Sequence, residues 1–184
     1  MQKLLLGAAA LAILFNCTKQ QSPFKIDQKH IGLLTDSTQV KDLKMVFPND
    51  SITKYISGDE FTGSKNNIEV FEKGGKRLLS LTPKYTLDST SVIQNIQIID
   101  SRYNTNKNIS TLSTFKDISS AYKISKISNL INSIVITVNE INADFAIDKE
   151  ELPANLRFDM NLKIEETHIP DNAKIKYFFI NWDN

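Results

Sequence analysis

The stretch Ile68-Glu69-Val70-Phe71-Glu72-Lys73-Gly74-Gly75-Lys76-Arg77-Leu78-Leu79-Ser80-Leu81 decides the architecture expected for this chain. Apolar residues recur at every second position before and after the two glycines, which favours a pair of strands. Adjacent glycines adopt the positive φ angles that a two-residue hairpin turn requires. The stretch therefore predicts an antiparallel hairpin in which Val70 lies opposite Leu79, Ile68 opposite Leu81, and Glu72 opposite Arg77.

The same alternation continues along most of the chain after residue 26. In Phe158 to Glu165, one face holds Phe158, Met160, Leu162 and Ile164, whereas the other holds only polar residues, which predicts a half-solvated antiparallel strand. A second hairpin is expected across residues 134–147. Further strands are expected at 51–57, 91–99, 132–138, 143–147 and 175–182.

The last of these strands is apolar on both faces, so it belongs inside a sheet or between sheets. Its aromatic residues are candidates for stacking on a sugar. Because they alternate along a strand, however, we assign them mainly to the core. They are Tyr177, Phe178, Phe179 and Trp182.

Two short helices are expected to interrupt the strands. In residues 38–47, Val40, Leu43 and Phe47 recur at helical spacing, with a cap from Asp36, Ser37 or Thr38 and a stop at Pro48. In residues 113–122, the residues at helical spacing after Ser113 are Phe115, Ile118 and Tyr122.

These two helical segments match each other without a gap at an offset of 75 residues. Leu34 aligns with Ile109, Thr38 with Ser113, Val40 with Phe115, Leu43 with Ile118, and Phe47 with Tyr122. We interpret the match as an internal duplication, with chance similarity of two capped helices as the alternative. The expected fold class is α+β: two helix-plus-antiparallel-sheet units, 26–105 and 106–184, packed into one compact domain.

The first residues indicate secretion. Lys3 is followed by an uncharged stretch from Leu4 to Phe15, about twelve residues long, which is too short for a helix that must cross a hydrocarbon layer of roughly 30 Å. Residues 1–16 are therefore expected to be a signal peptide that is removed. Residues 17–25 are polar after the cysteine and contain Pro23, so they predict a tether.

Leu14-Phe15-Asn16-Cys17 resembles the lipobox of bacterial lipoproteins, with an apolar residue three positions before the cysteine. Asn16 and Phe15 depart from the small residues usual there. The resemblance implies cleavage before Cys17 and lipid, including palmitate, on that cysteine. The chain is then held by its lipid on a membrane of the bacterial cell envelope, expected to be the outer membrane. The resemblance does not choose between the periplasmic and the outer side of that membrane.

Composition excludes several other classes. Removing residues 1–16 takes away Lys3 and no acid, so 21 basic and 21 acidic side chains remain. A nucleic-acid-binding face needs clustered basic residues, which this neutral chain lacks, so no nucleic-acid partner is expected. Cys17 is the single cysteine, so no intrachain disulfide is possible.

Two family resemblances follow from these elements. Ile31-Gly32-Leu33-Leu34-Thr35, with Thr38, Leu43, Phe47-Pro48 and Ile52 after it, is similar to the opening of a family of envelope lipoproteins with no assigned activity. The tandem units of about 75 residues resemble the architecture of beta-lactamase-inhibitor proteins, in which paired helix-plus-sheet repeats make a concave protein-binding surface. No inhibitory residue matches, so only the architecture is implied.

Residues with catalytic or metal-binding chemistry are few. His30 and His168 are the two histidines, and we interpret His30 as a surface residue. Glu165-Glu166-Thr167-His168 offers metal ligands, but on a strand these side chains alternate between two faces and do not converge. No metal, cofactor or catalytic residue is therefore expected, and we expect the chain not to be an enzyme.

The remaining polar candidates are interpreted as surface features. Asp42 and Asp117, equivalent in the duplication, are assigned to the solvated faces of their helices rather than to a paired-carboxylate site. The charge run of Asp148, Lys149, Glu150 and Glu151 is interpreted as a solvated turn before Pro153. Asp-Ser-Thr or Asp-Ser-Ile triplets at 36–38, 50–52 and 88–90 fit either turns and caps or an O-glycosylation motif.

The functional expectation is a membrane-anchored envelope lipoprotein that acts as a binding or interaction module, with an envelope protein as its partner. The alternatives are a structural or assembly accessory of the envelope and, less favoured by the residues, an unrecognised hydrolase. An uncovered aromatic-lined surface favours binding, whereas polar groups that converge in a pocket favour an enzyme.

Overall fold

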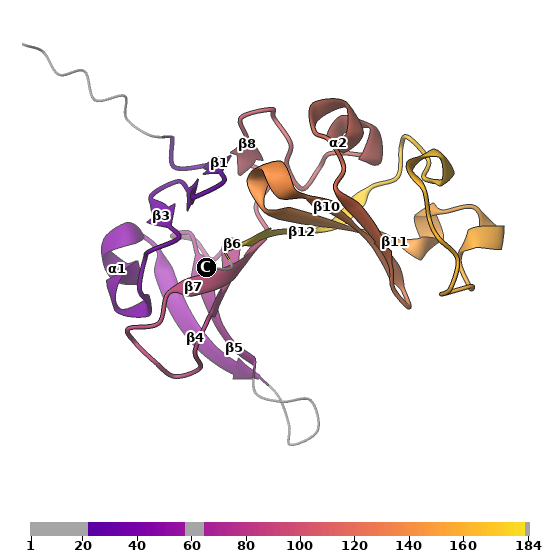
Figure 1. Ribbon diagram of the computed structural model, residues 1–184. Coiled ribbons are helices and arrows are strands. Elements are labelled where there is room, and N and C mark those ends of the chain that lie inside the picture. Colours follow the sequence, from indigo (N-terminus) through magenta and orange to yellow (C-terminus); the bar gives the residue numbers. More distant parts are fainter. Residues whose placement is uncertain (1–21, 58–64, 183–184) are drawn as a thin grey trace, which may run out of the picture.

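A computed structural model of the chain describes residues 22–57 and 65–182, and their strands form two sheets (Figure 1). The larger, eight-stranded sheet has the order β4-β5-β6-β7-β12-β11-β10-β9. Neighbouring strands in it are antiparallel throughout. Its strands are β4 (Ser51–Ser57), β5 (Lys65–Phe71), β6 (Arg77–Pro83), β7 (Ile93–Ile98), β9 (Lys126–Asn129), β10 (Ser133–Val138), β11 (Ala143–Asp148) and β12 (Ile175–Asn181).

The smaller sheet has four very short strands in the order β3-β2-β1-β8. They are β1 (Lys25–Asp27), β2 (His30–Ile31), β3 (Leu34–Thr35) and β8 (Asn104–Thr105). The helices are α1 (Leu43–Val46) and α2 (Phe115–Ala121), with 3-10 turns η1 (Val40–Asp42), η2 (Asn139–Ile141), η3 (Lys149–Glu151), η4 (Ala154–Leu156) and η5 (Glu166–His168). The fold is therefore a sheet-rich domain with few helices.

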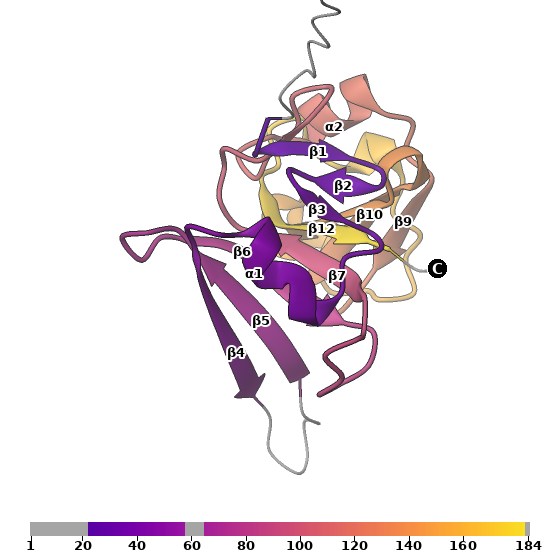
Figure 2. The same cartoon turned by 90° about the vertical axis from the view of Figure 1, so that its left-hand side faces the viewer.

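One face of the large sheet is the core. The register aligns a continuous row of apolar side chains across six strands, and each is at most 2% exposed. Figures 1 and 2 place α1, α2 and the small sheet along one side of the large sheet. Burying each such side chain contributes about 1.5–3 kcal/mol, so this row holds the strands together. The row is Val70, Leu79, Ile98, Phe178, Phe145 and Ile136.

The hairpin expected at 68–81 is confirmed, with one error in its turn. Ile68 pairs with Leu81 and Val70 with Leu79, but Phe71, not Glu72, lies opposite Arg77. The N–H of Glu72 donates to the carbonyl of Lys76, so the loop has three residues rather than two. Both glycines have positive φ, which supports the turn, and the extra residue is absorbed as a bulge.

The other expected strands lie where the alternation placed them, except one. Residues 158–165 form turns instead of a strand, and Phe158 is 87% exposed. The carboxylate of Asp159 accepts from the N–H of Asn161, a local bond that turns the chain. The side-chain amide of Asn129 donates to the carbonyls of Asp159 and Leu162. Hydrogen bonds from one side chain, rather than from a paired strand, therefore hold this segment.

The two expected helices are present but shorter than predicted. The first is a 3-10 turn followed by the single turn α1, and neither has a side-chain cap. The second begins after Thr114, not Ser113, because Thr114 and Asp117 form a capping box. The apolar stripes were predicted correctly, since all six residues are at most 9% exposed: Val40, Leu43, Phe47, Phe115, Ile118 and Tyr122.

The chain makes equivalent hydrogen bonds around the two helices. The hydroxyl of Thr38 accepts from the N–H of Thr35, and that of Ser113 accepts from the N–H of Ser110. Further backbone bonds recur with donors 75 residues apart. Val40 N–H donates to the carbonyl of Ser91 and Lys41 N–H to that of Ser89, while Phe115 N–H donates to Ala173 and Lys116 N–H to Asp171.

The first described residues pack against the domain. The rings of Phe24 and Tyr103 pack edge to face, with centroids 5.0 Å apart. The guanidinium of Arg102 lies 4.4 Å from the centroid of the Phe24 ring. Arg102 in turn pairs with Asp100, whose side chain is fully buried. Lys25 donates to Asn104 and to the carbonyl of Thr105, so β1 is fixed to β8.

The expected signal peptide 1–16, the expected lipidation site Cys17 and residues 18–21 of the expected tether lie outside the described residues. No helix in the described part of the chain is long and apolar enough to span a bilayer.

Candidate functional site

The second face of the large sheet, named the open face here, differs in chemistry from the core face. The register aligns a row of mainly polar side chains across it. The row passes from β7 to β12, the two central strands, at the pair Gln97 and Phe179. None of these side chains belongs to the apolar cluster on the other face. The row is Glu69, Ser80, Gln97, Phe179, Asp144 and Thr137.

Hydrogen bonds between strands hold the polar side chains of the open face in place. Asn95 donates to Asn181 at 2.6 Å, and Asn181 donates to Asp144 at 2.8 Å. Thr137 donates to the second oxygen of Asp144 at 2.6 Å. Because each bond joins different strands, the surface is preorganised rather than a set of independent rotamers.

The centre of the open face is hollowed. A pocket of about 400 Å³ lies where β5, β6, β7 and β12 meet, which is within the usual size of small-ligand sites. Five of its six lining residues carry an amide or hydroxyl group, and the sixth is Phe179. None of its lining residues is charged. They are Asn67, Ser80, Thr82, Asn95, Gln97 and Phe179.

The aromatic residues of β12 divide between the two faces. Phe178 and Trp182 are buried, as the assignment to the core requires. That assignment was wrong for Tyr177, which is 43% exposed, and Phe179 is only half-buried on the same open face. Their ring centroids lie 6.1 Å apart. The strand is apolar on both sides because one side is covered by the core and the other is an aromatic surface.

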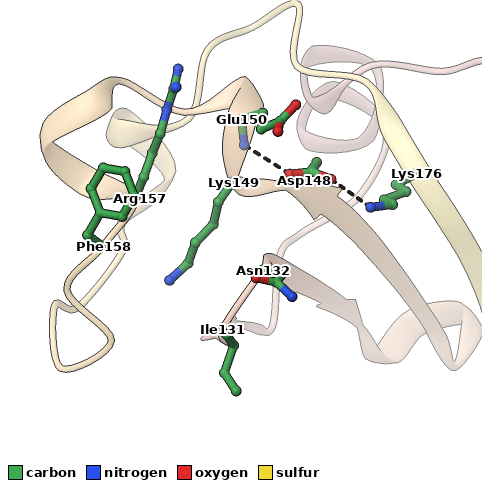
Figure 3. A pocket seen from close by; sticks show the side chains of 8 residues that line it. All are labelled: Ile131, Asn132, Asp148, Lys149, Glu150, Arg157, Phe158 and Lys176. Atoms are coloured by element: carbon green, nitrogen blue, oxygen red, sulfur yellow. Dashed lines mark hydrogen bonds and ion pairs between the residues drawn. The ribbon is translucent and has the colours of Figure 1, made fainter.

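A second candidate site lies at the end of β11, around Lys149 (Figure 3). This lysine was expected on a solvated turn, but it is only 5% exposed. Its ammonium nitrogen is buried and has no hydrogen-bond partner in the described part of the protein. The pocket beside it has a volume of about 450 Å³ and is lined by Ile131, Asn132, Asp148, Lys149, Glu150, Arg157, Phe158 and Lys176.

Three of the other charged side chains of this pocket have partners, and the carboxylate of Glu150 is exposed. Lys176 donates to Asp148 at 2.6 Å, and this bond lowers the pKa of the Asp148 carboxyl and raises that of the Lys176 ammonium. The N–H of Glu150 donates to the other oxygen of Asp148. The Nε of Arg157 donates to the carbonyl of Leu152 at 2.7 Å. Lys149 is therefore exceptional in its surroundings.

The remaining candidate residues are not brought together. His168 ends a 3-10 turn rather than a strand, and its Nδ1 accepts from the N–H of Glu165. His30 lies in β2. Asp117 caps α2, so its role is local. Among the residues described, no group of three His, Cys, Asp or Glu side chains is placed to hold a metal.

The three Asp-Ser triplets lie in turns or beside them, with the middle serine exposed in each case. Asp88 accepts from both the N–H and the hydroxyl of Thr90, as the turn interpretation requires. Thr38 is buried, and its hydroxyl accepts from Thr35.

Comparison with known proteins gives a likeness of fold. The crystal structure of the uncharacterized protein yfeY from Escherichia coli is similar, with a TM-score of 0.57 and 14% sequence identity over 85% of this chain and 99% of that chain. No protein-family model and no curated protein matches the chain.

Proposed function

We propose that this protein is a lipid-anchored binding module of the bacterial cell envelope, and that it holds its partner, an envelope protein, against the open face of the large sheet. The observation that supports this most is the pair Tyr177 and Phe179, which lies at the centre of a hollowed, hydrogen-bonded face. Aromatic side chains are enriched where proteins bind one another, because they add apolar contact area at a small entropic cost. A binding role needs no catalytic residue.

The architecture supports the same proposal. The strand order reads as two four-stranded halves that meet at β7 and β12, and Ile98–Phe178, Gln97–Phe179 and Ile96–Ile180 face one another there. We therefore propose that residues 26–105 and 106–184 are copies of one helix-plus-sheet unit. Their union makes one wide face, as in the inhibitor proteins that the sequence resembles.

The test is site-specific photo-crosslinking in the native envelope. A photoreactive residue in place of Tyr177 should give a discrete crosslinked band. The matched control replaces Lys41, which is exposed on the 3-10 turn beside α1. Equal crosslinking from both positions would contradict binding through the open face.

The anchor is tested separately with Cys17→Ser. Metabolic labelling with an acyl-chain analogue should mark the wild-type protein and leave the variant unlabelled. Equal label on both would contradict attachment at Cys17. This outcome is independent of the crosslinking result, so the anchor and the binding face can fail separately.

A further inference from the structure

Lys149 is held rigidly in place by its backbone. Its N–H donates to the carbonyl of Asn132 at 3.1 Å, and its carbonyl accepts from the N–H of Leu152 at 3.0 Å. The residue begins η3, immediately after β11. In Figure 3 its side chain points away from Asp148 and Glu150 and into the space between Phe158 and Ile131. Its ammonium is thus turned away from the nearby carboxylates.

A buried ammonium without a partner destabilises the fold, because it has lost its water and gained no opposite charge. Natural proteins retain such a group when it meets an ionic ligand or serves a reaction. Asp148 precedes Lys149 in the chain, but its carboxylate is paired with Lys176 at 2.6 Å. Lys149 has no partner among the described residues, which leaves its ammonium able to pair with an anionic ligand.

The rest of the lining defines the chemistry of that partner. Two acidic and three basic side chains line the pocket, which leaves one positive charge in excess. A single negative charge balances it, whereas a doubly charged phosphate does not. At the rim, Ile131 is 70% exposed and Phe158 is 87% exposed. They offer contact to an apolar group.

We infer that the Lys149 pocket binds a carboxylate on an apolar stem. The carboxylate pairs with the ammonium of Lys149, and the stem lies between Ile131 and Phe158. The ammonium is covered in the unliganded protein, so binding requires the side chains around it to move. The segment that carries Phe158 is attached to the sheet by the amide of Asn129, which donates to the carbonyls of Asp159 and Leu162. The site is separate from the open face.

Titration of the full chain in detergent, followed by NMR, tests the inference. The probes are hexanoate, hexan-1-ol as its uncharged match, and inorganic phosphate as an anion without a stem. Wild-type protein should bind hexanoate saturably, with shifts at Lys149 and Phe158. The alcohol and phosphate should each bind at least about tenfold more weakly than hexanoate. The alcohol lacks the paired charge and phosphate lacks the buried stem, and each of these contacts is worth a factor of that order.

Two variants assign the charge. Lys149→Met should lose the preference for hexanoate over hexan-1-ol while still binding the alcohol, which also shows that the pocket remains folded. The control Asp148→Asn/Lys176→Met removes the neighbouring ion pair and leaves the excess charge of the pocket unchanged, so it should keep the preference. Equal hexanoate affinity in Lys149→Met and wild type, or no saturable binding to wild type, would overturn the inference. Phosphate binding as tight as hexanoate would overturn the apolar stem.

Discussion

Phe178 and Phe179 are neighbours in β12 that point to opposite faces, and alanine at each position should have very different effects. Phe178 is fully buried, lies opposite Ile98 across the seam between the two halves of the sheet, and stacks on Phe145 at 4.5 Å between centroids. A core Phe→Ala change costs about 3–5 kcal/mol, and loss of an aromatic pair adds about 0.5–1.5 kcal/mol. Phe178→Ala should therefore destabilise the domain by roughly 3.5–6.5 kcal/mol.

Phe179→Ala removes a half-buried ring from the open face and should cost roughly 1 kcal/mol. Urea denaturation followed by circular dichroism measures both changes, and similar slopes for the variants would show that the midpoints report stability. If Phe179→Ala proved as costly as Phe178→Ala, the two faces would be wrongly assigned. The crosslinking proposal would then lose its basis.

Three further changes probe other parts of the fold. Asp100→Asn should cost about 2–3 kcal/mol at neutral pH, since it unpairs Arg102 from a buried carboxylate. The hydrogen bond from Arg102 lowers the pKa of Asp100 below its ordinary value of 3.8, so the ionised carboxylate stabilises the fold at pH values above 3.8. Denaturation at several pH values should therefore show the stability difference between wild type and Asp100→Asn shrinking as the pH falls below 3.8. Thr114→Ala should cost about 1 kcal/mol by removing the α2 cap, whereas Ser120→Ala in the same helix should be neutral or slightly stabilising. Phe47→Ala should cost ~3–5 kcal/mol while Lys41→Ala costs almost nothing, and thermal melting compares the two.

Local sequence patterns were sufficient to predict strands that pair with the next strand along the chain and bury one face. The hairpin at 68–81 could be predicted because alternation and the glycine pair both lie within fourteen residues. The same alternation at 158–165 was misleading, since a strand also needs a backbone to pair with and Asp159 formed a turn instead. The small sheet could not be predicted, because β1 pairs in parallel with β8, about 79 residues away.

The candidate sites were only partly visible in the sequence. Tyr177 and Phe179 stood out as aromatic, but a strand that is apolar on both sides does not tell which side is covered. Lys149 lies in a run of charges that is typical of a solvated turn, but it is buried by tertiary packing, with its backbone bonded to Asn132. No local signal distinguishes such a lysine from its exposed neighbours.

Protection of the open face in the intact envelope is the most direct test of the binding proposal. Tyrosine labelling compares Tyr177, on the open face, with Tyr85, which is 61% exposed on the loop between β6 and β7. The account predicts that Tyr177 is labelled in the purified protein and protected in the envelope, while Tyr85 is labelled equally in both. Equal labelling of Tyr177 in the two states would contradict a partner bound to the open face.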